Sequence, residues 1–181
     1  MKTTHLIRSA FLPHFLKKLK KHKQILIADD HAAIRNGIKH VLTLEFSSLE
    51  FDEAVSFKDI FKKLKESVWD LLILDIDLPD NNGLKILQKI KSEGIAIPVL
   101  IFSFHREDQF AIRALNAGAQ GYLSKHAAAN ELITAVQLVL SGEKYMSAFV
   151  AKQIEAETAI SPNPQSRNFL AKSQFSNENK E

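Results

Sequence analysis

The stretch Leu71-Leu72-Ile73-Leu74-Asp75-Ile76-Asp77-Leu78-Pro79 decides the fold of this 181-residue chain. Four consecutive aliphatic residues predict a strand buried on both faces, as central strands of parallel sheets are. Pro79 and the following Asn81-Asn82-Gly83 predict a turn. In open parallel sheets, ligands and reactive groups lie outside the carboxyl ends of the strands. Asp75 is therefore a candidate reactive group, although an isolated Asp at a strand end is usually an ordinary loop residue.

Strand-like and helix-like segments alternate on both sides of this stretch. Apolar runs at 25–28, 49–55, 71–74, 98–102 and 121–123 predict five strands. Ser56 and Asp59 predict a capping box at the start of one helix. The helical stripes are Ile34, Ile38, Val41 and Leu42; Phe57, Ile60, Phe61, Leu64 and Val68; Leu84, Leu87 and Ile90; Phe110, Ala114 and Leu115; and Leu132, Ile133, Val136, Val139 and Leu140. Because parallel neighbours need crossover connections, this order predicts an α/β fold with a doubly wound, five-stranded parallel sheet.

The first residues differ in charge from the rest of the chain. Residues 1–24 contain seven Lys or Arg and no acid, so the net charge of +3 leaves about −4 for the remainder. We favour a solvated tail for this basic arm (residues 1–23), with contact to an anionic membrane surface or nucleic acid as the alternative. The absence of Cys and of any run of about 18 apolar residues argues against a disulfide framework and a membrane span.

Polar residues follow four of the five predicted strands. They are Asp29 and Asp30 after the first, Asp75 after the third, Ser103 after the fourth and Lys125 after the fifth. Parallel strands bring their carboxyl ends to one edge, so we expect these side chains to converge. Three neighbouring carboxylates need a cation, and an all-oxygen ligand set favours Mg²⁺. A carboxylate beside Mg²⁺ and a lysine is equipped to attack a phosphoryl group.

These residues, in this order and spacing, resemble the receiver domain of bacterial two-component response regulators, of the NarL/FixJ-like kind with LuxR-type output domains. The resemblance covers residues 24–147 and implies a flavodoxin-like (βα)5 fold. The matching residues are Asp29-Asp30-His31, Arg35, Gly37, Asp75-Ile76-Asp77-Leu78-Pro79-Asp80, Gly83, Ser103, Ala117-Gly118-Ala119, Gly121-Tyr122-Leu123 and Lys125.

The resemblance also implies a role for each residue of the site. Asp75 would be the phosphoacceptor, and Lys125 would contact the phosphoryl group. Asp30 and Asp75 would bind Mg²⁺ directly, Asp29 would act through water, and Asp77 would contribute its backbone carbonyl.

Ser103 and Tyr122 resemble the switch pair that reorients when a receiver is phosphorylated. The implied function is a response regulator of a two-component phosphorelay, a cytoplasmic phosphoprotein that accepts its phosphoryl group from a sensor histidine kinase or a phosphotransfer protein. It would be a signalling protein and not an enzyme, with at most self-catalysed phosphorylation and dephosphorylation. A phosphorylation-dependent homodimer is a further expectation.

One enzyme family shares part of the central motif. Asp75-Ile76-Asp77 after an apolar strand also resembles the nucleophile motif of haloacid-dehalogenase-type phosphatases, in which Asp77 would be the acid/base. That family has its metal-binding acidic pair downstream of the nucleophile, whereas Asp29-Asp30 lies upstream. The receiver interpretation is therefore favoured.

Residues 148–181 are expected to form a linker and a polar tail. Ile160-Ser161-Pro162, Arg167, Leu170 and Phe175-Ser176-Asn177 faintly resemble the start of a LuxR-type helix-turn-helix. The sequence stops before a recognition helix, so sequence-specific DNA binding by the family's usual route is not expected. A truncated, non-functional transcription factor is the corresponding alternative.

Overall fold

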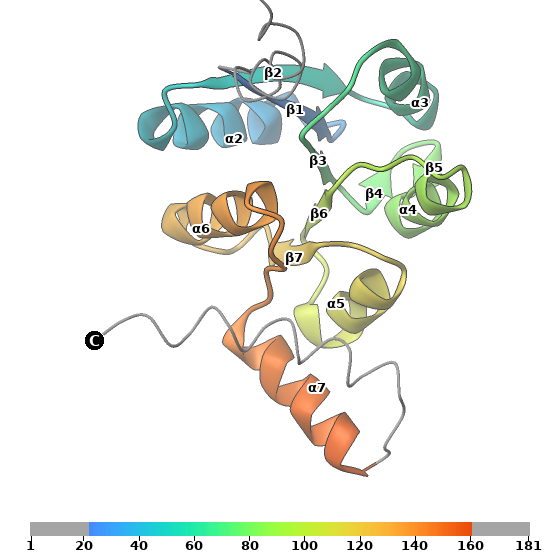
Figure 1. The fold of residues 1–181 in the computed structure, drawn as a ribbon, viewed down its shortest axis with the longest axis vertical. Helices are drawn as coiled ribbons and strands as arrows, with labels where there is room; N and C mark the ends of the chain where they lie inside the picture. The colour runs from blue at the N-terminus through green and yellow to red at the C-terminus, as the bar shows by residue number, and fades with distance from the viewer. Residues whose placement is uncertain (1–21, 161–181) are drawn as a thin grey trace, which may run out of the picture.

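The computed structural model describes residues 22–160 and is built on a five-stranded parallel sheet (Figure 1). The strands are β1 (Lys23–Ala28), β2 (Leu49–Ala54), β3 (Leu71–Leu74), β6 (Val99–Ser103) and β7 (Gly121–Ser124). They lie in the order β2-β1-β3-β6-β7, and every neighbouring pair is parallel. The doubly wound sheet predicted from the sequence is confirmed. The predictions for most of the basic arm and for the helix-turn-helix-like segment lie outside the described residues.

Helices cover both faces of this sheet (Figure 1). Helices α2 (Ala32–Glu45) and α6 (Ala129–Leu140) lie on one face. Helices α3 (Phe57–Glu66), α4 (Gly83–Ser92) and α5 (Glu107–Asn116) lie on the other. Each helix connects two parallel strands or follows the last one, which is the crossover that parallel pairing requires.

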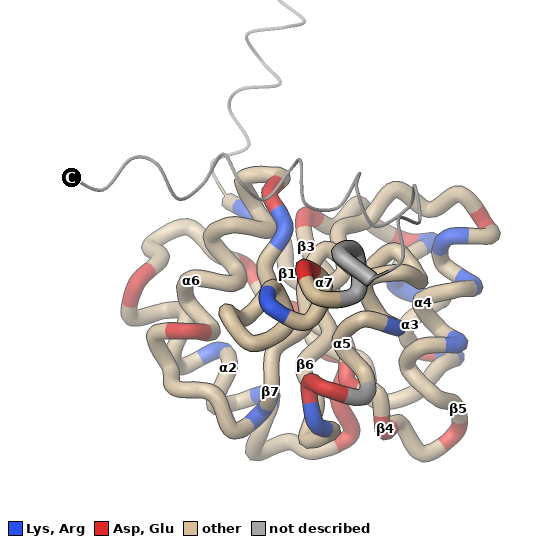
Figure 2. The backbone as a smooth tube through the Cα atoms, turned by 90° about the horizontal axis from the view of Figure 1, so that it is seen from below, with Lys and Arg blue, Asp and Glu red and all other residues tan. Residues whose placement is uncertain are grey.

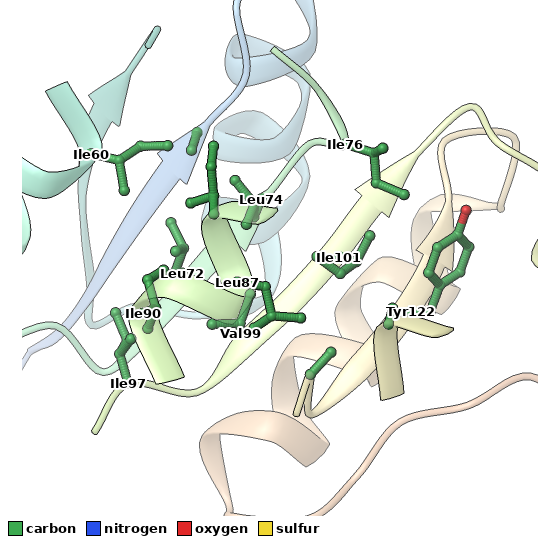
Figure 3. Packing of buried hydrophobic residues seen from close by; sticks show 14 of the residues in the cluster. Ile60, Leu72, Leu74, Ile76, Leu87, Ile90, Ile97, Val99, Ile101 and Tyr122 are labelled. Carbon is green, nitrogen blue, oxygen red and sulfur yellow. The ribbon is translucent and has the colours of Figure 1, made fainter. Parts of the chain in front are cut away.

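The central strand β3 contributes to the core on both faces. Leu72 and Leu74 belong to the apolar cluster beneath α3, α4 and α5 (Figure 3), whereas Leu71 and Ile73 belong to the cluster beneath α2 and α6. Successive side chains of a strand point to opposite faces, so only an unbroken apolar run can fill both clusters. All four residues are buried, as predicted.

Helix α3 begins where the sequence predicts and ends earlier than predicted. The Ser56 hydroxyl accepts a hydrogen bond from the Asp59 backbone N–H at 3.2 Å, as a capping residue should. The inclusion of Val68 in the buried stripe is wrong, because the helix ends at Glu66 and Val68 is 76% exposed. The backbone is extended at Ser67, directly after the helix, so Val68 no longer lies on the helix face.

Two features of the structure are absent from the sequence prediction. Strands β4 (Asp77–Leu78) and β5 (Asn81–Asn82) form a small antiparallel hairpin between β3 and α4. Helix α7 (Ala148–Ile160) packs beside α5, where Val150 and Ile154 are buried one turn apart. Two buried positions are too few to produce a visible helical period in the sequence.

Charged residues of both signs are distributed along the described backbone, and lysines gather on α3 and α4 (Figure 2). Within residues 22–160, no helix combines the length and apolar character needed to cross a bilayer.

Candidate functional site

The fold brings the polar strand-end residues to one edge of the sheet. Asp29 and Asp30 follow β1, Asp75 follows β3, Ser103 ends β6, and Lys125 follows β7. Since all five strands are parallel, these positions share the carboxyl-end edge, as the sequence predicted.

Lys125 connects the two buried carboxylates of this edge. Its Nζ lies 2.6 Å from Oδ2 of Asp29 and 2.6 Å from Oδ2 of Asp75. The side chain of Lys125 is 1% exposed and those of both aspartates are 2% exposed. Burying a charge is costly unless it is paired, so the ammonium stabilises two carboxylates that would otherwise repel each other.

A set of possible cation ligands surrounds this ion pair. Asp29, Asp30, His31 and Asp75 each offer one ligand atom, and these atoms lie within 4.8 Å of one another. Oδ1 of Asp75 is buried and has no hydrogen-bond partner among the described residues. Asp30 is a third exposed, which leaves the cluster open to solvent on one side. Carboxylate oxygens in this arrangement fit a hard divalent cation.

Arg35 anchors the loop that carries the first two carboxylates. Its Nη1 donates a 2.8 Å hydrogen bond to the backbone oxygen of Asp29, and its Nε donates to the Glu53 carboxylate. Hydrogen bonds from Lys39 and then Arg35 hold the pKa of the Glu53 carboxyl below its usual value. Arg35 thus positions the acidic pair by holding the backbone of Asp29, and its own side chain is not one of the possible cation ligands.

Gly83 sets how closely the start of helix α4 approaches Asp75. A Cβ atom at position 83 would lie 2.3 Å from the backbone oxygen of Asp75 and 2.8 Å from the Cα of Ile76. The Gly83 N–H donates to the Ile76 oxygen at 2.8 Å. No side chain fits there, so glycine allows this hydrogen bond and keeps the loop after Asp75 compact.

The two residues predicted to form a switch pair meet the same loop residue, His105. The buried Ser103 hydroxyl accepts a hydrogen bond from the His105 N–H at 3.2 Å, and the Tyr122 hydroxyl donates to the His105 oxygen at 2.8 Å. The Tyr122 ring is buried on the α5 side of the sheet (Figure 3). Burial, and then the nearby Glu107 carboxylate, raise the pKa of Tyr122 far above its usual value. Sequence reasoning missed His105, whose signal is its position two residues after the strand-end serine.

The Asp77 side chain is not part of the cation-ligand group. Its carboxylate is 57% exposed and lies 2.8 Å from Nε2 of His105. The role implied for Asp77 concerns its backbone carbonyl, and that role stays a prediction. His31 is the residue of the ligand group that sequence reasoning did not assign, although its place directly after Asp29-Asp30 was a signal.

Comparison with known proteins agrees with this architecture. The family model for the response regulator receiver domain matches residues 25–137. The transcriptional activator protein ExaE of Pseudomonas putida is 36% identical over 140 residues, which cover 77% of this chain and 64% of that protein. The response regulator UvrY of Escherichia coli K12 is 31% identical over 143 residues, which cover 76% of this chain and 66% of UvrY. The chain thus spans just under two thirds of the length of these relatives.

Solved structures show the same fold. A two-component response regulator of the LuxR family from Aurantimonas sp. SI85-9A1 aligns with a TM-score of 0.68 and 28% identity, covering 76% of this chain and 99% of that one. A LuxR family DNA-binding response regulator from Silicibacter pomeroyi aligns with a TM-score of 0.61 and 31% identity, covering 70% and 98%. With a matched family model, a shared sheet topology and relatives that are themselves response regulators, this chain belongs to the response regulator receiver domain family.

Proposed function

We propose that this chain is a phosphorylation-controlled switch in which Asp75 accepts a phosphoryl group from a sensor histidine kinase or a phosphotransfer protein. The observation that supports this most is the state of the Asp75 carboxylate. One oxygen is paired with Lys125, and the other is buried beside the acidic cluster without a partner among the described residues. This carboxylate is the nucleophile of the proposed reaction.

In the proposed transfer, one oxygen of the Asp75 carboxylate forms a bond to phosphorus while the phosphorus–nitrogen bond of the donor phosphohistidine breaks. The donor imidazole leaves with the electron pair and takes a proton. The Lys125 ammonium, already beside Asp75, would contact an oxygen of the transferred group and offset its charge.

The acidic cluster is proposed to hold Mg²⁺ through Asp29, Asp30 and Asp75, with the backbone carbonyl of Asp77 as a further ligand. A bound divalent cation would supply positive charge to the phosphoryl oxygens. Carboxylate and carbonyl oxygens are the ligands that Mg²⁺ prefers, which is why we propose this ion.

The response to phosphorylation is proposed to run through Ser103 and Tyr122. A phosphoryl group adds strong acceptor oxygens, so the Ser103 hydroxyl would turn toward it and give up the hydrogen bond from the His105 N–H. Because the Tyr122 hydroxyl binds the oxygen of the same residue, a moving His105 loop would change the surroundings of Tyr122.

We infer that the output is signalling and not multiple-turnover catalysis, with at most self-catalysed gain and loss of the phosphoryl group. Relatives of this chain are a transcriptional activator and a response regulator, so control of transcription is the proposed output of the whole protein. A cytoplasmic location and a phosphorylation-dependent homodimer belong to the same proposal.

The test is phosphorylation by acetyl phosphate in the presence of Mg²⁺, followed by mass spectrometry. We expect one base-labile phosphoryl group, absent from Asp75→Asn and retained in Asp77→Asn, whose side chain lies outside the ligand group. Undiminished labelling of Asp75→Asn would refute the assignment. Steady hydrolysis of phosphate esters that depends on the Asp77 side chain would support the phosphatase class instead.

A second variant tests the switch separately. Ser103→Ala should accept the phosphoryl group on Asp75 and fail to dimerise in response, because the hydroxyl that would reorient is gone. A variant that dimerises on phosphorylation like the parent would remove Ser103 from the mechanism.

A further inference from the structure

We propose that His31 is a ligand of the divalent cation, and that its imidazole raises the affinity of the site for transition-metal ions such as Co²⁺ and Ni²⁺ without raising that for Mg²⁺. This inference rests on the proposed metal site at Asp29, Asp30 and Asp75. It adds a nitrogen ligand to a set that otherwise consists of oxygen atoms.

The geometry of the histidine relative to the acidic pair supports this. Nδ1 of His31 lies 2.8 Å from Oδ1 of Asp30 and 3.4 Å from Oδ1 of Asp29. An octahedral ion with bonds of about 2.1 Å holds neighbouring ligand atoms about 3.0 Å apart and opposite ones about 4.2 Å apart. The four candidate ligand atoms all lie within 4.8 Å of one another, so one ion can reach them with small side-chain movements.

A second observation points to a ligand at this place. Oδ1 of Asp75 is buried and has no hydrogen-bond partner among residues 22–160, while Lys125 uses the other oxygen of the same carboxylate. A buried carboxylate oxygen without a donor is costly. A cation between Asp75 and the Asp29-Asp30-His31 segment would satisfy it.

The local backbone holds His31 beside the acidic pair without using its side chain. The His31 N–H donates to Oδ1 of Asp29 at 2.8 Å, and the residue precedes helix α2 in an extended conformation. Its imidazole forms no capping hydrogen bond and is 63% exposed. The polar partners that the structure gives this ring are the carboxylates of Asp29 and Asp30. The ring is therefore dispensable for the helix and available to a metal ion.

The imidazole has a nitrogen lone pair to offer the cation. In the structure, Nδ1 lies 2.8 Å from an oxygen of the Asp30 carboxylate. With a cation, the neutral tautomer that carries its proton on Nε2 leaves the Nδ1 lone pair as the ligand. Imidazole suits the later first-row transition metals, whereas Mg²⁺ prefers oxygen and retains water, so this ligand adds to the affinity for those metals and not to that for Mg²⁺.

The experiment compares the full-length protein with His31→Ala by isothermal titration calorimetry, using Mg²⁺ and Co²⁺ separately. We expect His31→Ala to weaken Co²⁺ binding by about tenfold or more. Mg²⁺ affinity should change by less than about twofold, since its carboxylate ligands remain. His40→Ala is the matched control, because it removes an exposed imidazole from helix α2, which begins directly after His31, and it should bind both ions like the parent. The visible absorption of bound Co²⁺ should change in His31→Ala and not in His40→Ala.

Equal losses for Mg²⁺ and Co²⁺ in His31→Ala, or no loss for either, would show that His31 lies beside Asp30 without binding the ion and would overturn the proposal. This outcome is distinct from failure of the proposed function. Phosphorylation that is unaffected by Asp75→Asn would refute the function, whereas the metal titrations report on His31 alone.

Discussion

Lys125 and Asp75 form a buried ion pair at 2.6 Å across a strand that lies between them. Lys125 follows β7 and Asp75 follows β3, and β6 separates those strands in the sheet. A buried charge that loses its partner destabilises the folded state, so this pair couples the stability of the protein to the state of the Asp75 carboxylate.

Replacement of the lysine should expose that coupling. In the absence of divalent cations, Lys125→Ala should lower the free energy of unfolding by about 3 kcal/mol, because Asp29 and Asp75 keep their charges in a buried site. Added Mg²⁺ should restore part of the loss by supplying positive charge. Urea denaturation followed by the fluorescence of Trp69, the single tryptophan, measures both effects.

The control is Lys89→Ala, which removes an exposed lysine that pairs with Glu93 along helix α4. Its effect should stay below about 0.5 kcal/mol and should not respond to Mg²⁺. Similar losses in the two variants would contradict the role given to the buried pair.

The two adjacent aspartates should differ in their contribution to stability. Asp29→Ala should destabilise the protein, because Asp29 is buried and binds both the Lys125 ammonium and the His31 N–H. Asp30→Ala should leave the stability of the metal-free protein equal or higher, since it removes a more exposed charge from a crowded acidic cluster. Both should weaken Mg²⁺ binding. Unfolding curves without metal and calorimetric titrations with Mg²⁺ separate these effects, and an unfolded Asp30→Ala would show that Asp30 is structural.

Two glycine-to-alanine substitutions should change the free energy of unfolding in opposite directions. Gly83→Ala should destabilise the protein and disturb Asp75, because its Cβ would lie 2.3 Å from the Asp75 backbone oxygen. Gly37→Ala should stabilise it by about 0.5–1 kcal/mol, because position 37 lies within helix α2 and a Cβ there meets nothing within 4 Å. Denaturation midpoints test both predictions. An unchanged midpoint for Gly83→Ala would mean that the loop after Asp75 can move to accommodate the added Cβ at little cost.

The two tyrosines of the chain should resist ionisation while the protein is folded. Burial, with help from Glu131, raises the pKa of Tyr145 to about 12, and burial raises the pKa of Tyr122 further. The unfolded chain releases these protons near pH 10, so stability should fall as pH rises above about 10. An ultraviolet titration of phenolate should show no ionisation at pH 10 until urea is added. Ionisation of one full tyrosine at pH 10 in the folded protein would contradict the burial of these rings.

The arrangement of the sheet could be derived from local patterns. Leu71 to Leu74 form an unbroken apolar run, and such a run is stable only where both faces of a strand are covered. Once five such strands alternate with helices, parallel pairing brings Asp29, Asp75 and Lys125 to one edge whatever the loops do. The sequence by itself therefore determined the fold class and the edge at which the site lies.

The contacts within the site were decided only by the tertiary structure. That Lys125 joins Asp29 to Asp75 depends on how far the strands are offset, and that His105 lies between Ser103 and Tyr122 depends on the packing of one loop. The directions of these side chains do not follow from any periodic pattern in the sequence. The same holds for helix α7, whose buried residues Val150 and Ile154 become recognisable as a face only once α5 is there to cover them.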